Sequence, residues 1–132
     1  MEDQKTQIKT LISALESDTQ SGVEAEVSLI EIGASAVEAL IGATKHSNSI
    51  VRYRAVWALG KIRDGKGFEA ILSLSQDASA EVRFDAILAL GELGDVRAIP
   101  YLKALRTSST VFEGDRAAAT VALSKFKNKR CK

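Results

Sequence analysis

The feature that most constrains this chain of 132 residues is an internal repeat. Two segments align without gaps at an offset of 31 residues, 51–64 (VRYRAVWALGKIRD) and 82–95 (VRFDAILALGELGD). A weaker copy lies upstream, where Ala25 and Leu29 match Ala55 and Leu59 at an offset of 30. A partial copy lies downstream at an offset of 33. A unit of this length cannot bury its apolar face alone, so the copies are expected to stack on one another.

The apolar spacing predicts two helices in each copy. In the copy that contains residues 82–95, a first helix is expected over about 80–93, with Ala86 and Leu90 on its buried face. Gly94 is the expected C-cap of this helix, and Asp95 the expected N-cap of a second helix over about 96–106. The single proline, Pro100, falls in the first turn of that second helix, where a missing N–H is tolerated.

These patterns predict one all-α domain over residues 1–132. Its expected architecture is a right-handed α-solenoid of stacked helix pairs, with about eight helices in all. We expect an N-terminal cap helix within 1–19, repeats at 20–46, 47–76 and 77–106, and a partial C-terminal repeat with a basic tail at 107–132.

Composition excludes several kinds of site. One Cys rules out an internal disulfide framework and a four-cysteine zinc site, and one His rules out a site with two imidazoles. We therefore expect no metal and no cofactor. Lys and Arg number 18 and Asp and Glu 17, so the net charge is +1 and nucleic acid is not an expected partner. No apolar run could span a membrane and the first residues are polar, so we expect a cytoplasmic protein.

The repeat resembles a known family. The string Val-Arg-x-x-Ala-x-x-Ala-Leu-Gly-x-[Ile/Leu]-x-Asp, followed by Ala98-Ile99-Pro100-Tyr101-Leu102, is similar to HEAT repeats. More narrowly, it resembles the short HEAT-like repeats of the phycocyanobilin lyase and phycobilisome-degradation group. That resemblance implies an alternative function as a phycobiliprotein-related factor: a bilin lyase-type subunit, a chromophore-handling chaperone or a degradation factor. Bilin would be a ligand, and a phycobiliprotein the partner, only on this alternative.

Charged residues recur with the repeat. Arg52, Arg83 and Arg116 occupy one equivalent position, and Asp64 and Asp95 another. Arginines and aspartates of neighbouring repeats are expected to form a structural ladder of hydrogen-bonded charges along the stack. The alternative is a regular array that binds an anionic partner.

Apolar residues recur on the opposite side of the first helices from the alanine core. Val27, Trp57, Leu88 and Val121 share one position, and Tyr53 and Phe84 share another, one turn earlier. At about 100° per residue, position 57 lies about 200° from Ala55. One interpretation is packing between adjacent first helices. The other is an exposed convex stripe that binds a partner or a second copy, with Tyr53, Trp57, Phe84 and Leu88 as its candidate residues.

The second helices of such repeats are expected to line a concave surface. Their outward candidates are Glu69, Ser73, Tyr101, Lys103 and Arg106. No catalytic constellation is present in the sequence, so we expect no enzyme. The favoured function is a non-catalytic protein-binding module, an adaptor or scaffold that holds a protein partner on the concave face or on the convex stripe.

Overall fold

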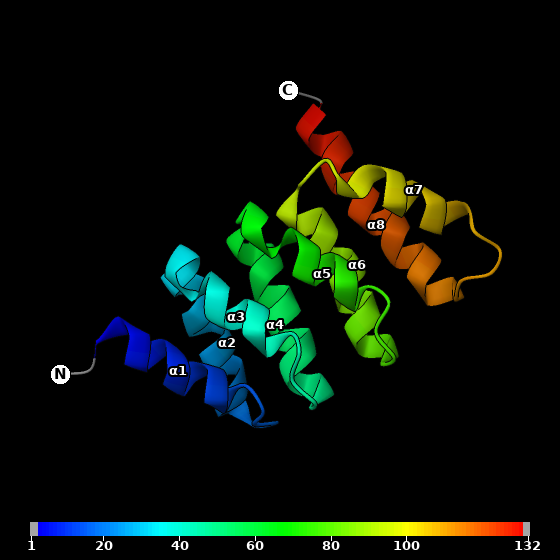
Figure 1. Cartoon of the computed structure of the whole chain (residues 1–132). Helices are drawn as coiled ribbons and strands as arrows, with labels where there is room; N and C mark the ends of the chain where they lie inside the picture. Colours follow the sequence, from blue (N-terminus) through cyan, green and yellow to red (C-terminus); the bar gives the residue numbers. More distant parts are fainter. Residues whose placement is uncertain (1–2, 131–132) are drawn as a thin grey trace.

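The computed structural model describes residues 3–130, with side chains up to residue 126, and its regular secondary structure over that range consists of helices (Figure 1). Its α-helices are α1 (Gln4–Ala14), α2 (Gln20–Ile32), α3 (Val37–Ala43), α4 (Ser49–Ile62), α5 (Phe68–Leu74), α6 (Ala80–Leu93), α7 (Ala98–Thr107) and α8 (Glu113–Arg130). Short 3-10 turns, η1 (Gly33–Ala36) and η2 (Gly65–Gly67), precede α3 and α5. The expected all-α fold with about eight helices is confirmed.

The helices stack in two layers that follow the chain from one end of the molecule to the other (Figure 1). Helices α2, α4, α6 and α8 pack on one another in order, and we call them the first layer. Helices α3, α5 and α7 form the second layer, and each packs on the first-layer helix that follows it. Helix α1 covers α2 and α3 at the N-terminal end. This arrangement is the α-solenoid that the repeat predicts.

Small residues form the contact between first-layer helices. A Cβ added to Gly91 would lie 2.7 Å from the Cα of Ala122, and one added to Gly60 would lie 2.9 Å from the Cβ of Ala89. Helices α4 and α6, and then α6 and α8, therefore approach almost backbone to backbone. The position equivalent to Gly60 in α2 is Ile30, and the contact between α2 and α4 is less extensive. The glycine thus sets how closely neighbouring repeats pack.

Helices α2, α4 and α6 each end at a residue with a positive φ angle. Gly33, Arg63 and Gly94 have φ values of 76°, 64° and 75°. The predicted C-cap at Gly94 is confirmed, because its amide donates to the carbonyl of Leu90. Arg63 adopts this conformation without being glycine, and its guanidinium donates to the carbonyl of Glu92 in the next repeat.

The recurring arginines hold the loops between repeats. Each guanidinium donates to two backbone carbonyls of the loop that precedes its own helix. These pairs are Arg52 with His46 and Ser47, Arg83 with Asp77 and Ala78, and Arg116 with Ser108 and Val111, at 2.8–3.3 Å. Because a loop carbonyl away from its helix needs a donor, these side chains fix the turn into each first-layer helix.

The carboxylate partners of these arginines differ from the expected ones. Arg52 makes a two-pronged pair with Asp77, with both donor–acceptor distances at 3.0 Å, and Arg83 Nε donates to Asp115 Oδ2 at 3.0 Å. The backbone carbonyl of Asp77 also accepts from Arg83. Arg52, Asp77, Arg83 and Asp115 therefore form a continuous series of hydrogen-bonded groups along the inter-repeat loops. Both pairs are largely shielded from solvent.

The expectation that Asp64 and Asp95 complete the ladder is wrong. The Asp64 carboxylate accepts the amide N–H of Lys66, and the Asp95 carboxylate accepts the amide and guanidinium N–H groups of Arg97. Each aspartate therefore closes the turn after its own first helix. This local turn also moves the start of α7 to Ala98, two residues beyond the predicted one.

We predict that Gly91→Ala destabilises the protein by about 1–3 kcal/mol, because the new methyl group meets the backbone of Ala122. The matched control is Gly42→Ala, where no atom lies within 4 Å of the added Cβ. That change should stabilise the protein by up to about 1 kcal/mol through helix propensity. Urea denaturation followed by circular dichroism measures both, and a Gly91→Ala variant as stable as Gly42→Ala would contradict the close-contact argument.

Candidate functional site

The apolar stripe predicted on the first helices lies at the surface of the first layer. Val27, Phe84 and Val121 are 49%, 42% and 50% exposed, whereas Tyr53, Trp57 and Leu88 are half-buried against the core. The side chains thus pack at their bases and present their outer parts to solvent. The stripe therefore combines packing against the core with partial exposure to solvent.

Two hollows open along this stripe. The larger, about 710 Å³, lies over α4, α6 and the start of α8, and the smaller, about 400 Å³, lies over α2, α4 and α6. They share Tyr53 and Asp85 in their walls. We call the pair the first-layer groove, and its principal lining residues are Glu26, Tyr53, Trp57, Glu81, Arg83, Phe84, Asp85, Leu88, Phe112 and Asp115.

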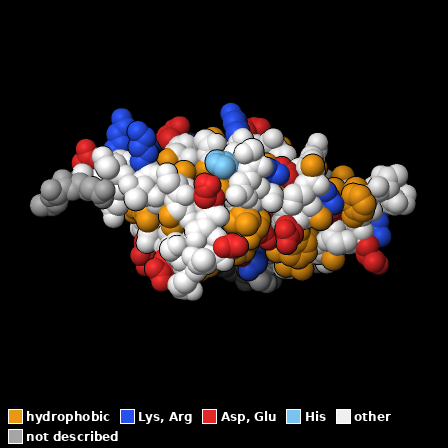
Figure 2. Space-filling view, turned by 90° about the horizontal axis from the view of Figure 1, so that it is seen from below, with side chains coloured by type: hydrophobic (Ala, Val, Ile, Leu, Met, Phe, Trp, Pro, Cys, Tyr) orange, Lys and Arg blue, Asp and Glu red, His pale blue; other side chains and the backbone are white. Residues whose placement is uncertain are grey.

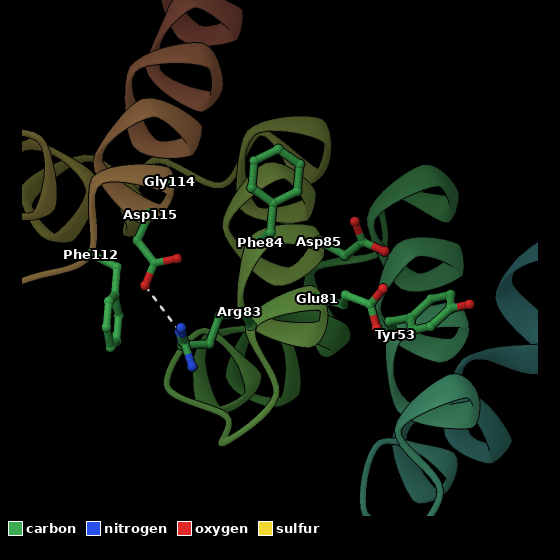
Figure 3. A pocket seen from close by; sticks show the side chains of 9 residues that line it. Tyr53, Glu81, Arg83, Phe84, Asp85, Phe112, Gly114 and Asp115 are labelled. Atoms are coloured by element: carbon green, nitrogen blue, oxygen red, sulfur yellow. Dashed lines mark hydrogen bonds and ion pairs between the residues drawn. The ribbon is translucent and has the colours of Figure 1, made fainter.

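One wall of the groove is built by an ion pair and a stacked ring. Arg83 donates to Asp115, and its guanidinium lies 4.7 Å from the centroid of the Phe112 ring (Figure 3). Phe112 is 68% exposed and precedes α8. The same arginine that holds the loop therefore also positions an aromatic side chain at the rim.

Acidic side chains occupy the other wall. Figure 3 shows Glu81 and Asp85 on the side of α6 that faces Tyr53 of α4. Burial, together with the neighbouring Glu81 charge, raises the pKa of Asp85 above its ordinary value. Burial likewise raises the pKa of Glu26 to about 7, an effect that Arg54 opposes and Asp85 reinforces. The Glu26 and Arg54 side chains approach to 4.0 Å (Oε1 to Nε).

Trp57, the only tryptophan of the chain, lines the smaller hollow. The ammonium group of Lys61 lies 5.6 Å from the centroid of its ring and 3.5 Å from the Glu92 carboxylate. One side of the ring is therefore covered by Lys61, while the rest contributes to the groove.

The second-layer candidates do not line the first-layer groove, although Tyr101 lines a neighbouring hollow of about 400 Å³ that shares Arg83, Phe112 and Asp115 with it. Glu69, Ser73, Lys103 and Arg106 are exposed on α5 and α7. Tyr101 is half-buried, and its hydroxyl lies 2.7 Å from Ser75 Oγ, so its polar end is already occupied. The structure thus brings together Tyr53, Trp57, Phe84 and Leu88, and it leaves the second-layer set dispersed.

Sequence reasoning missed the acidic wall and the aromatic rim. Glu26 occupies the position equivalent to Val56 and Ile87, which are fully buried. A carboxylate at an otherwise apolar repeat position was the signal that could have revealed it. Phe112 lies in the longer loop before α8, where the repeat pattern breaks and gives no position to compare.

On the side of the molecule that carries the inter-repeat loops, the surface has hydrophobic patches separated by charged side chains (Figure 2). These patches are more extensive in the half away from the N-terminal end.

Over residues 3–126, no three His, Cys, Asp or Glu side chains gather as a metal site would require. Within the described chain, no helix has the length and hydrophobicity needed to cross a bilayer.

Comparison with known proteins identifies the family. A family model described as HEAT repeats matches residues 36–124. The chain belongs to the HEAT-repeat family. Among curated proteins, no sequence matches this HEAT-repeat chain.

Solved structures with the same fold as this HEAT-repeat protein include two that align over nearly all of it. The complex of CpcE and CpcF of phycocyanin lyase from Nostoc aligns with a TM-score of 0.82 and 23% identity, over 94% of this chain and 80% of that chain. Human deoxyhypusine hydroxylase, solved in complex with glycerol, aligns with a TM-score of 0.77 and 17% identity, over 96% of this chain. This chain spans only 46% of that hydroxylase chain. The resemblance to the lyase group expected from the sequence is confirmed at the level of the fold.

We predict that Glu26→Gln changes how stability depends on pH. Because burial raises the folded pKa of Glu26 to about 7, the native protein binds the proton more tightly than the unfolded chain, and stability falls as pH rises toward 7. Glu26→Gln should remove this loss, with a gain of about 3 kcal/mol at pH 8 that vanishes near pH 4. Urea titrations at several pH values measure it. The exposed Glu31→Gln is the control, and parallel stability curves for wild type and Glu26→Gln would contradict the assignment.

Proposed function

We propose that this protein is a non-catalytic protein-binding module that holds a partner in the first-layer groove. The observation that carries the proposal is the run of half-exposed Tyr53, Trp57, Phe84 and Leu88 along two adjoining hollows. Aromatic side chains supply large contact areas and lose little conformational entropy on binding, which is why they dominate binding hot spots.

The rigid stack supports this role. The arginine pairs fix the loops, and the glycine contacts fix the spacing between α4, α6 and α8, so the groove exists before a partner arrives. A preformed surface avoids the ordering cost that a mobile one incurs on binding. In the second layer, where the sequence placed an alternative binding surface, Glu69, Ser73, Lys103 and Arg106 are exposed and line neither hollow of the groove.

We predict that Phe84→Ser reduces recovery of the native partner at least tenfold when the full chain is immobilised and exposed to native cell extract. Phe84 is 42% exposed, so its loss removes contact area at little cost to folding. Quantitative mass spectrometry of the eluates measures recovery. The matched control is Lys103→Glu with Arg106→Glu on α7, which should leave recovery unchanged. A loss in this second-layer variant together with full recovery by Phe84→Ser would place the partner on the other layer.

A second function, as a phycobiliprotein-related factor, is supported by the fold shared with the phycocyanin lyase complex over 80% of that chain. On this proposal the partner is a phycobiliprotein and the ligand handled is a bilin.

We predict, for this second function, that phycocyanobilin mixed with the purified protein changes its visible absorption spectrum, alone or with apo-phycobiliprotein present. Phe84→Ser should reduce the change if the bilin enters the groove. An unchanged phycocyanobilin spectrum, both with the protein alone and with apo-phycobiliprotein present, would exclude bilin handling.

A further inference from the structure

The first-layer groove has an unbalanced charge. Its carboxylates are Glu26, Glu81, Asp85 and Asp115, and its cations are Arg83 and, behind Glu26, Arg54. Arg83 is paired with Asp115 and with two loop carbonyls. Arg54 is buried and donates to the carbonyls of Leu15 and Ser17. Both guanidinium groups are thus used in holding the fold.

The remaining carboxylates lie close to the aromatic side chains. Asp85 lines both hollows with Tyr53, and Glu26 lines the smaller one with Tyr53 and Trp57. Over the described residues, neither Glu81 nor Asp85 forms a salt bridge. The groove therefore combines apolar rings with negative charge that the chain itself does not neutralise.

From this combination we infer that the groove binds a partner segment in which a Lys or Arg side chain is flanked by apolar residues. The cation would lie between Glu26 and Asp85 and against the ring of Tyr53, where both charge attraction and the ring quadrupole favour it. The flanking apolar residues would contact Trp57 and Leu88 on one side and Phe84 and Phe112 on the other. This inference rests on the proposed binding function and specifies the chemistry of its partner.

The raised pKa values of the groove carboxylates are consistent with binding of a cation. Burial raises the pKa of Glu26 and of Asp85, and the mutual repulsion of neighbouring carboxylates adds to it. A bound cation would relieve that repulsion and favour the charged carboxylates. Affinity for a basic segment should therefore rise with pH up to about 7 and level off above it, since Glu26 is then ionised.

Acidic and purely apolar partners are not expected to bind the first-layer groove. An acidic peptide or a nucleic acid would bring like charge against Glu26, Glu81 and Asp85, and a purely apolar segment would leave these carboxylates desolvated without a partner. A small inorganic cation could neutralise the carboxylates but would leave the aromatic wall exposed. These alternatives are separate arms of the test.

The test uses the full chain and short synthetic peptides of leucine, serine and lysine in which each lysine lies between leucines. Matched peptides carry glutamate or norleucine in place of lysine. Binding is followed by the fluorescence of Trp57, the sole tryptophan, and by anisotropy of labelled peptide. The lysine peptide should bind at least tenfold more tightly than the glutamate peptide, and its affinity should fall several-fold at pH 5.5 relative to pH 8.

Substitutions in the groove test whether its carboxylates bind the lysine peptide. Glu26→Gln with Asp85→Asn should weaken binding of the lysine peptide about tenfold at pH 8 and abolish the pH dependence. The control, Glu16→Gln with Glu31→Gln, removes the same net charge from exposed positions outside the groove and should leave affinity unchanged. Circular dichroism of each variant confirms that the fold is retained.

Several outcomes would overturn the inference. These are equal affinity for the lysine and glutamate peptides, tighter binding of the norleucine peptide, an unchanged affinity in the Glu26/Asp85 variant, or no binding of any peptide. Saturable quenching of Trp57 by calcium chloride that the same variant removes would assign the carboxylates to a metal ion instead. The broader binding function is tested separately, because it fails only if Phe84→Ser leaves native partner recovery intact.

Discussion

The contact on which the structure depends is the near-backbone approach of successive first-layer helices. Gly60 meets Ala89, and Gly91 meets Ala122, so that neither member can carry a larger side chain without separating the helices. This spacing keeps the outer faces of α4, α6 and α8 close together. Residues that lie on separate helices, such as Tyr53, Phe84 and Phe112, thereby line one hollow. The binding surface is a consequence of how small the interior residues are.

The fold was predictable because its information is periodic. The recurrence of Ala55, Ala86 and Ala119 fixes the buried side of each first helix, and Gly94 marks the helix end with a conformation that glycine adopts most easily. The stripe of Trp57 and Leu88 followed from the same period. The charge ladder was only half predictable, because hydrogen-bond partners across a loop depend on the path of that loop. Asp77 and Asp115 occupy no matching repeat positions, whereas Asp64 and Asp95 do.

The features that give the groove its chemical character are departures from the repeat. Glu26 replaces the apolar residue found at Val56 and Ile87, and Asp85 stands where the preceding repeat has Arg54. Both carry a raised pKa in the folded protein, chiefly through burial. An ionisable group held where an apolar one would pack well costs stability, so such positions are better candidates for function than the regular ones. A repeat protein acquires specificity at the positions where its copies differ.

One substitution within the repeat ties the N-terminal end to its neighbour. The position equivalent to Arg52 in the first repeat is Gly22, and a side chain there would collide with the guanidinium of Arg54. Arg54 reaches back from α4 to donate to the carbonyls of Leu15 and Ser17, so the first loop is held by the second repeat. The units of this array are therefore not interchangeable modules. Lengthening the array by copying the second repeat would set the buried arginine equivalent to Arg54 against the loop that Arg52 already holds.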